Sequence, residues 1–102
     1  MSYRVRFTAD AEDDIVRLYE FILARDDGDW LPAERALHAI KMAINNLQFS
    51  PFSHRKAIAG NSFIRELIIA LGATGYVALF EIESDELVTI LAIRHQREDD
   101  YL

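Results

Sequence analysis

The sequence of 102 residues contains no cysteine, only two prolines and four glycines, and no long apolar run. Without cysteine, disulfides and thiolate metal sites are excluded, and a reducing compartment is the expected environment. The longest aliphatic run, Leu67 to Leu71, is far shorter than the ~20 residues that a membrane-spanning helix needs. The first seven residues alternate polar and apolar side chains and do not resemble a signal peptide. We therefore expect a soluble, cytoplasmic protein with no membrane partner.

The size and composition of the chain predict one folded unit. A chain of 102 residues has room for a single domain, which we expect to span residues 1–102. Because 51% of the residues are hydrophobic, the chain can build an apolar core without disulfides or metal ions.

The charge of the chain is unevenly distributed. The net charge of −6 argues against sequence-independent binding to nucleic acid, which depends on many lysines and arginines. Residues 35–65 nevertheless contain five basic residues and no acidic one. These charges either form a local basic face or simply solvate a helix and a loop.

The sequence contains no motif for a metal or a cofactor. His38, His54 and His95 lack the close spacing of a local metal site, and the four glycines are scattered rather than gathered in a phosphate-binding loop. We therefore predict no metal and no cofactor.

The first half of the chain predicts a strand and two helices. Polar and apolar residues alternate over residues 3–7, which is typical of a strand with one buried face. Thr8 can cap a helix that ends near Arg25. Asp29 can cap a second helix, which Phe49-Ser50-Pro51 closes. Two amphipathic helices joined by a few residues indicate a hairpin lying on a sheet.

The second half predicts a loop followed by three strands. We expect a loop over residues 50–61 and strands at about 63–70, 76–83 and 87–94, with short turns between them. The order is then β-α-α-β-β-β. The predicted fold is α+β, with the helix hairpin packed on a mostly antiparallel four-stranded sheet.

This order resembles the RelE/ParE toxin family, and five segments carry the resemblance. They are Tyr3–Ala11 at the first strand and helix start, Leu47–Pro51 at the close of the second helix, Phe63–Leu67 with its arginine, Gly75–Phe80 in the strand that often reads YRVLY, and Ile90–Arg97 with its basic exit. The resemblance implies the toxin of a type II toxin–antitoxin system, a class that includes plasmid stabilisation proteins. It also implies a cognate antitoxin as partner in a hetero-oligomer.

Members of this family inhibit growth in two ways. Some are ribosome-dependent endoribonucleases that cut mRNA, and the ParE-like branch poisons DNA gyrase by binding. Cleavage of RNA needs an acid, a base and cations that stabilise the charged transition state. Arg65, Arg94 and His95 are the candidates for these roles if the chain is a nuclease. The structural alternatives are an ion pair with Glu66 or another acidic neighbour for Arg94, and a surface position for His95.

Further residues are candidates for binding the cellular target or the antitoxin. Target-binding candidates are Arg94, His95, Arg97, Tyr101, Arg55 and Lys56. A helix hairpin leaves the other face of the sheet partly uncovered, so apolar residues there mark a partner site. Antitoxin-binding candidates are Ile64, Ile68, Leu71 and Trp30.

The middle strand favours the ParE-like branch. Many nuclease members carry an arginine there, whereas Tyr76–Phe80 contains no basic residue. The acidic balance of the chain also fits poorly with docking among RNA phosphates. We therefore expect a toxin that binds DNA gyrase and is not an enzyme. The alternatives are an mRNA endoribonuclease acting with ribosome and mRNA, and a non-toxic remnant that still binds an antitoxin.

Overall fold

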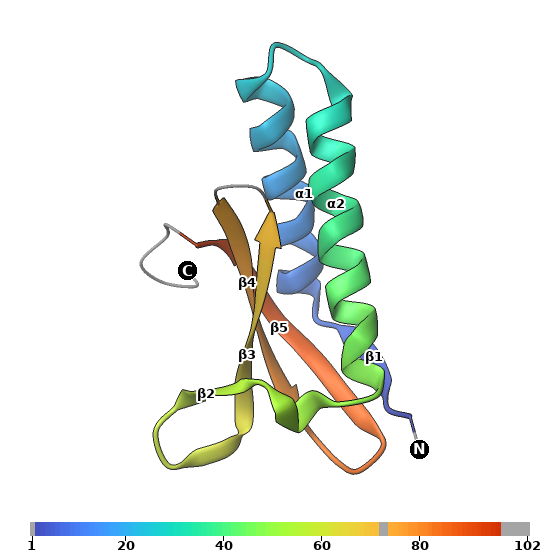
Figure 1. Cartoon of the computed structure of the whole chain (residues 1–102), viewed down its shortest axis with the longest axis vertical. Helices are drawn as coiled ribbons and strands as arrows, with labels where there is room; N and C mark the ends of the chain where they lie inside the picture. Colours follow the sequence, from blue (N-terminus) through green and yellow to red (C-terminus); the bar gives the residue numbers. More distant parts are fainter. Residues whose placement is uncertain (1, 72–73, 97–102) are drawn as a thin grey trace.

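The computed structural model describes residues 2–71 and 74–96 and has two layers, a helix hairpin and a sheet (Figure 1). The elements in chain order are β1 (Arg4–Phe7), α1 (Ala9–Arg25), α2 (Trp30–Asn45), the short 3₁₀ helices η1 (Asn46–Gln48) and η2 (Pro51–Ser53), β2 (Arg55–Ile58), β3 (Asn61–Leu71), β4 (Thr74–Ile82) and β5 (Leu87–His95). The α+β class and the helix hairpin are as predicted.

Within the described residues, the strands form one sheet of five, in the order β1-β5-β4-β3-β2. Only the β1–β5 pair is parallel, so the prediction of a mostly antiparallel sheet is confirmed. The prediction of four strands is wrong, because β2 lies inside the expected loop at 50–61. Residues 55–58 form an edge strand with three exposed residues and one partly buried one, so no apolar alternation marks it in the sequence.

Both helices begin at the capping residues that the sequence predicts. Thr8 accepts a hydrogen bond from the Ala11 N–H, and Asp29 accepts one from the Leu31 N–H. Such caps satisfy backbone donors that have no partner within the helix, at about 1 kcal/mol each. Between the helices, Asp27 and Gly28 take the left-handed conformation, with φ of 55° and 82°. This reverses the chain and aligns α1 and α2 side by side on one face of the sheet (Figure 1).

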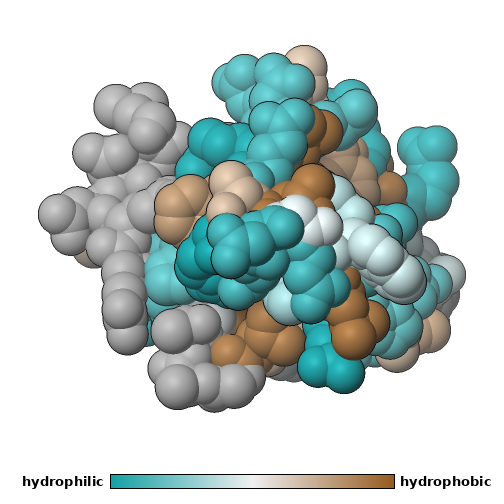
Figure 2. Space-filling model, turned by 90° about the horizontal axis from the view of Figure 1, so that it is seen from above, coloured by the Kyte–Doolittle hydropathy of each residue, from teal (hydrophilic) through white to brown (hydrophobic). Residues whose placement is uncertain are grey.

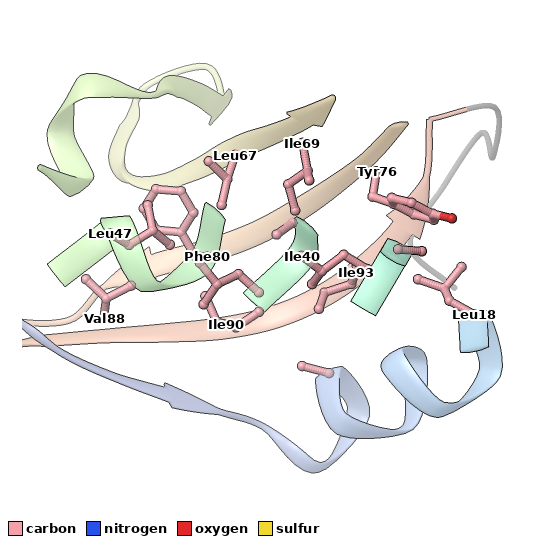
Figure 3. Close-up of a cluster of buried hydrophobic side chains, with 14 of the residues drawn as sticks. Leu18, Ile40, Leu47, Leu67, Ile69, Tyr76, Phe80, Val88, Ile90 and Ile93 are labelled. Carbon is pink, nitrogen blue, oxygen red and sulfur yellow. The ribbon is translucent and has the colours of Figure 1, made fainter. Parts of the chain in front are cut away.

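The core lies between the two helices and the sheet (Figure 3). Phe80 of β4 is fully buried there, together with Ile90 and Ile93 of β5. The helices contribute apolar side chains at helical spacing, which are Leu18, Ile22, Ile40 and Ile44. Burying each of these large side chains contributes about 1.5–3 kcal/mol.

The sequence of β5 is nearly all apolar because both faces of this strand are mostly buried, and a β-bulge changes its alternation. Leu79 pairs with Ala92 whereas Phe80 pairs with Ile90, so Leu91 is an extra residue in the strand. The bulge shifts the alternation of faces by one residue, and the core therefore receives Ile90 and Ile93, three residues apart. Thr8 makes two hydrogen bonds to β5 at the bulge. Its backbone N–H donates to the Ile90 carbonyl, and its hydroxyl donates to the Leu91 carbonyl at 3.2 Å.

Candidate functional site

The strand register assigns each candidate residue to one face of the sheet. Ala78 and Tyr76 of β4 pack in the core on the helix side, so their cross-strand partners share that face. The side chains that alternate with these along each strand project from the other side of the sheet, which we call the open face. Arg94, opposite Val77, lies on the open face, and His95, opposite Tyr76, lies on the helix face.

Arg94 is held within an ionic cluster on the open face. Its side chain is only 14% exposed, and its guanidinium lies 3.9 Å from the Glu66 carboxylate. The guanidinium also donates to the His95 carbonyl at 3.2 Å. The other Glu66 oxygen accepts from Arg55 Nε at 3.1 Å. Glu66 therefore joins Arg55 and Arg94 in one network, and its pairing with Arg94 is the structural alternative that the sequence offered for that arginine.

His95 packs on the opposite face, against an aromatic ring. The His95 and Tyr76 rings meet edge to face, with centroids 5.5 Å apart. Burial raises the pKa of Tyr76 above 10.0, and the positive charge of Arg25 partly opposes this rise. His95 is thus part of the packing where β4 begins and β5 ends.

Arg65 binds backbone carbonyls of the segment before β2. Its Nη1 donates to the carbonyls of His54 at 2.6 Å and Phe52 at 3.2 Å, and its Nε donates to the Ser62 carbonyl at 2.8 Å. The guanidinium also lies over the Phe52 ring, 5.1 Å from the centroid. These contacts attach η2 to the start of β3, which is a structural use of the arginine fork.

His54 is a further titratable residue beside Arg65, and the sequence did not single it out for a role. Its ring meets the Phe80 ring edge to face, with centroids 6.0 Å apart. Burial lowers the pKa of His54 below 6.5, and the nearby Arg65 charge lowers it further. His54 therefore favours the neutral form in the folded protein.

The structure does not bring the three candidate catalytic residues together. Arg65 is paired with Phe80, and His95 with Tyr76. Four residues along β4 separate these positions, roughly 13 Å at strand rise. Arg94 lies on the other face of the sheet. No shared site therefore joins Arg65, Arg94 and His95.

The remaining target-binding candidates fall into two groups. Arg55 and Lys56 are exposed on β2, at the edge of the sheet. Arg97 and Tyr101 lie outside the described residues. Among the described residues, no group of three or more acidic or histidine side chains could hold a metal ion.

The antitoxin-binding candidates do not share one surface. Ile68 is 41% exposed on the open face, and Ile64 shares that face but is partly buried. Leu71 was expected beside them and lies on the helix face instead, where it packs against the core. The reason is the strand period of two, which places residues 68 and 71 on opposite sides. Trp30, the first residue of α2, is 62% exposed.

A groove runs between the outer sides of α1 and α2. Its volume is about 510 Å³, and we call it the helix groove; its lining is Ile15, Val16, Tyr19, Glu20, Leu23, Glu34 and Leu37. The Tyr19 hydroxyl donates to Glu34 at 3.0 Å across the groove, and this bond is the main reason that the pKa of Tyr19 is raised. Figure 2 views the molecule from the end where the hairpin turns and shows apolar side chains exposed among hydrophilic ones.

The outer edge of β3 is only partly covered. The β2–β3 pairing extends no further along β3 than Glu66. In the described parts of the chain, the outer side of residues 67–71 therefore has no neighbouring strand. An edge of this kind can accept an added strand.

The fold is that of chains from solved toxin–antitoxin systems. The structure superposes on a chain from the chromosomal ParDE toxin–antitoxin system of P. aeruginosa with a TM-score of 0.71 and 18% identity, covering 92% of this chain and 96% of that one. A chain from the RelBE2 toxin–antitoxin complex of Mycobacterium tuberculosis gives a TM-score of 0.56 and 24% identity, covering 96% and 95%.

The sequence identifies the family directly. Residues 5–100 match the sequence model described as the ParE toxin of the type II toxin–antitoxin system parDE. The chain belongs to this ParE toxin family, as the sequence resemblance predicted. No curated protein matches the chain in sequence. In the described residues, no helix is both long enough and apolar enough to cross a membrane.

Proposed function

We propose that this chain inhibits growth by binding and poisoning DNA gyrase, and that a cognate antitoxin neutralises it in a hetero-oligomer. The proposal starts from membership of the ParE toxin family. The observation that carries the non-hydrolytic mode is the placement of the candidate catalytic residues. Arg65 and His95 lie far apart on the helix face, and Arg94 lies on the open face. Gyrase acts in the cytoplasm, so this location is part of the proposal.

The chemistry of RNA cleavage explains why this placement matters. Attack by a 2′-hydroxyl needs a base, an acid and cations around the same phosphate. Arg94 is mostly buried beside Glu66, and Arg65 donates to three backbone carbonyls. Either guanidinium would have to leave these partners in order to bind phosphate. This supports a toxin that acts by binding a protein target.

Two surfaces suit an antitoxin. The helix groove has apolar walls and two carboxylates, from Glu20 and Glu34, which fits an amphipathic helix with basic flanking residues. The outer edge of β3 at residues 67–71 suits an added strand beside the exposed Ile68. Trp30 is exposed at the start of α2, in the helix hairpin, and offers an aromatic anchor for a partner.

The test is induced expression in a bacterial host, with and without the antitoxin gene. We expect growth arrest with a DNA-damage response while early translation continues, and rescue by the antitoxin. Arg94→Ala and His95→Ala should keep full toxicity where the variant protein remains folded, because Arg94 is mostly buried beside Glu66 and His95 packs on Tyr76, which speaks against either as a contact to gyrase. Val16→Asp, which places a charge in the helix groove, should keep the growth arrest and weaken the rescue. Arg35→Ala, on the exposed side of α2, is the matched control and should change neither readout.

Other outcomes would identify the alternatives. Rapid loss of translated messages, abolished by Arg94→Ala or His95→Ala, would show an mRNA endoribonuclease and contradict the proposal. Abundant, harmless expression of the folded chain would show a remnant that has lost its toxicity.

A further inference from the structure

A cavity lies where the two β-hairpins of the sheet separate. The β3–β4 pairing runs from Leu71–Thr74 down to Ile64–Glu81. Beyond that point β3 turns toward β2 and β4 turns toward β5, and the hairpins diverge at the end of the sheet away from the helix turn (Figure 1). The cavity between them measures about 430 Å³. We call it the aromatic notch; its aromatic and acidic lining residues are Tyr3, Phe52, Phe63, Glu81, Glu83 and Asp85.

The two phenyl rings of the notch are exposed and in contact with each other. Phe52 is 47% exposed and Phe63 is 53% exposed, and the two rings meet edge to face with centroids 6.1 Å apart. The Tyr3 backbone is held by a hydrogen bond from its N–H to the Gln48 carbonyl at 2.7 Å. Phe52 already binds one guanidinium, that of Arg65. The exposed ring of Phe63 can therefore attract a further cation.

The carboxylates of the notch are only partly neutralised. Glu83 accepts hydrogen bonds from Arg6 at 3.0 Å and from Thr89. In the part of the chain that the structure describes, the carboxylates of Glu81 and Asp85 make no hydrogen bond or ion pair. The neighbouring Arg65 keeps its positive charge, but the three carboxylates of the notch outnumber the two adjacent guanidiniums, those of Arg6 and Arg65. The notch therefore combines a negative field with exposed ring faces.

We propose that the aromatic notch binds an arginine side chain presented by a segment of a partner protein. Charge complementarity selects a cation, and the rings favour a planar guanidinium, which stacks on aromatic faces and is more weakly hydrated than an ammonium. The first residues of β3 disfavour an added strand. The Phe63 N–H donates to Asn61 Oδ1 at 3.0 Å, and the Ser62 carbonyl accepts from Arg65. With these backbone groups occupied, the notch presents mainly side-chain surfaces.

The notch is separate from the surfaces assigned to the antitoxin. None of its lining residues lines the helix groove. A partner that inserts an arginine here can therefore bind while the groove is occupied. The proposal does not depend on gyrase as the cellular target, because binding at the notch is measured on the purified chain alone.

The test is an NMR titration of the ¹⁵N-labelled full chain with an acetylated and amidated Gly-Arg-Gly peptide. The matched probe is the same peptide with citrulline, which has nearly the same shape and no charge. We expect saturable shifts of the amides of Asn61, Phe63 and Asp85 with the arginine peptide, and at most weak shifts with the citrulline peptide.

Substitutions in the notch locate the binding. The double variant Glu81→Gln/Asp85→Asn should weaken the arginine peptide by at least about fivefold, because it removes both free carboxylates. Phe63→Leu, which keeps the apolar volume and removes the ring, should weaken binding by about twofold or more. Glu86→Gln is the control, since this exposed carboxylate lies in the same turn and does not line the notch.

Three results would overturn the proposal. One is equal binding of the arginine and citrulline peptides. Another is a loss for Glu86→Gln as large as that for the double variant, which would indicate diffuse attraction to an acidic surface. The third is the absence of saturable shifts in the wild-type chain at millimolar peptide.

Discussion

Replacing Arg65 by alanine is expected to lower the free energy of unfolding by about 2–3 kcal/mol. The side chain donates hydrogen bonds to the carbonyls of Ser62, Phe52 and His54, at 2.8, 3.2 and 2.6 Å. Each such bond contributes about 0.5–0.7 kcal/mol, at the lower end of the usual range, because these partly exposed acceptors can return to water. The guanidinium also packs on the Phe52 ring, which adds a few tenths of a kcal/mol to about 1 kcal/mol.

Urea unfolding followed by circular dichroism measures this loss. With a slope of about 1.5 kcal/mol per molar urea, the midpoint should fall by roughly 1.3–2 M. Arg65→Lys keeps the charge and loses the planar fork, so its midpoint should lie between those of the wild type and Arg65→Ala.

Arg35→Ala is the matched control for this substitution. Arg35 is exposed on α2 and has no hydrogen bond or ion pair within the described residues, so its replacement should change the unfolding free energy by less than about 0.5 kcal/mol. An Arg65→Ala variant as stable as the control, and no longer toxic, would refute the structural role and restore Arg65 as a functional residue.

Three further changes test other parts of the structure. Gly75→Ala places a methyl group closer to the Ile69 carbonyl oxygen than van der Waals contact allows, and should lower the free energy of unfolding, measured by thermal unfolding, by about 1–3 kcal/mol. Gly28→Ala lies in open space with φ of +82° and should lower it by about 1 kcal/mol. Thr8→Ala removes the cap of α1 and the bond to the Leu91 carbonyl, and should lower the unfolding free energy by about 1–2 kcal/mol. Because burial and then Arg65 lower the pKa of His54 below 6.5 in the folded state, the unfolded chain binds this proton more tightly. His54 therefore makes stability highest above pH 6.5 and lower as the pH falls toward its folded pKa. His54→Gln should flatten the stability–pH curve in that window, and an unchanged curve would contradict the assignment.

The helices could be predicted because their signals are local. A capping side chain, charges in the first turn and an apolar stripe all lie within one segment, as at Thr8 and Asp29. The strands β4 and β5 were also predictable, since both are mostly buried and rich in branched apolar residues. β2 was not predictable, because Arg55 and Lys56 are exposed at a sheet edge and no buried face imposes an alternation.

Predicting which candidate residues share a site required the register of the strands, and the sequence determines that register only in part. Arg94 and His95 are neighbours on one strand, so strand geometry alone places them on opposite faces. Whether Arg94 or His95 shares a face with Arg65 depends on the β4–β5 pairing and on the bulge at Leu91. No local sequence pattern predicts that bulge. Two of the three acceptors of Arg65, the carbonyls of Phe52 and His54, belong to η2 and the residue after it, a segment whose path is set by tertiary contacts.

The measurement that tests the central claim most directly is a reaction of purified DNA gyrase, plasmid and this chain. The account predicts that linear, gyrase-cleaved plasmid accumulates in proportion to the chain, that the Arg94→Ala and His95→Ala variants act equally, and that the antitoxin prevents the cleavage. Normal gyrase turnover at all concentrations of the chain, together with cleavage of mRNA on ribosomes that Arg94→Ala or His95→Ala abolishes, would contradict the account.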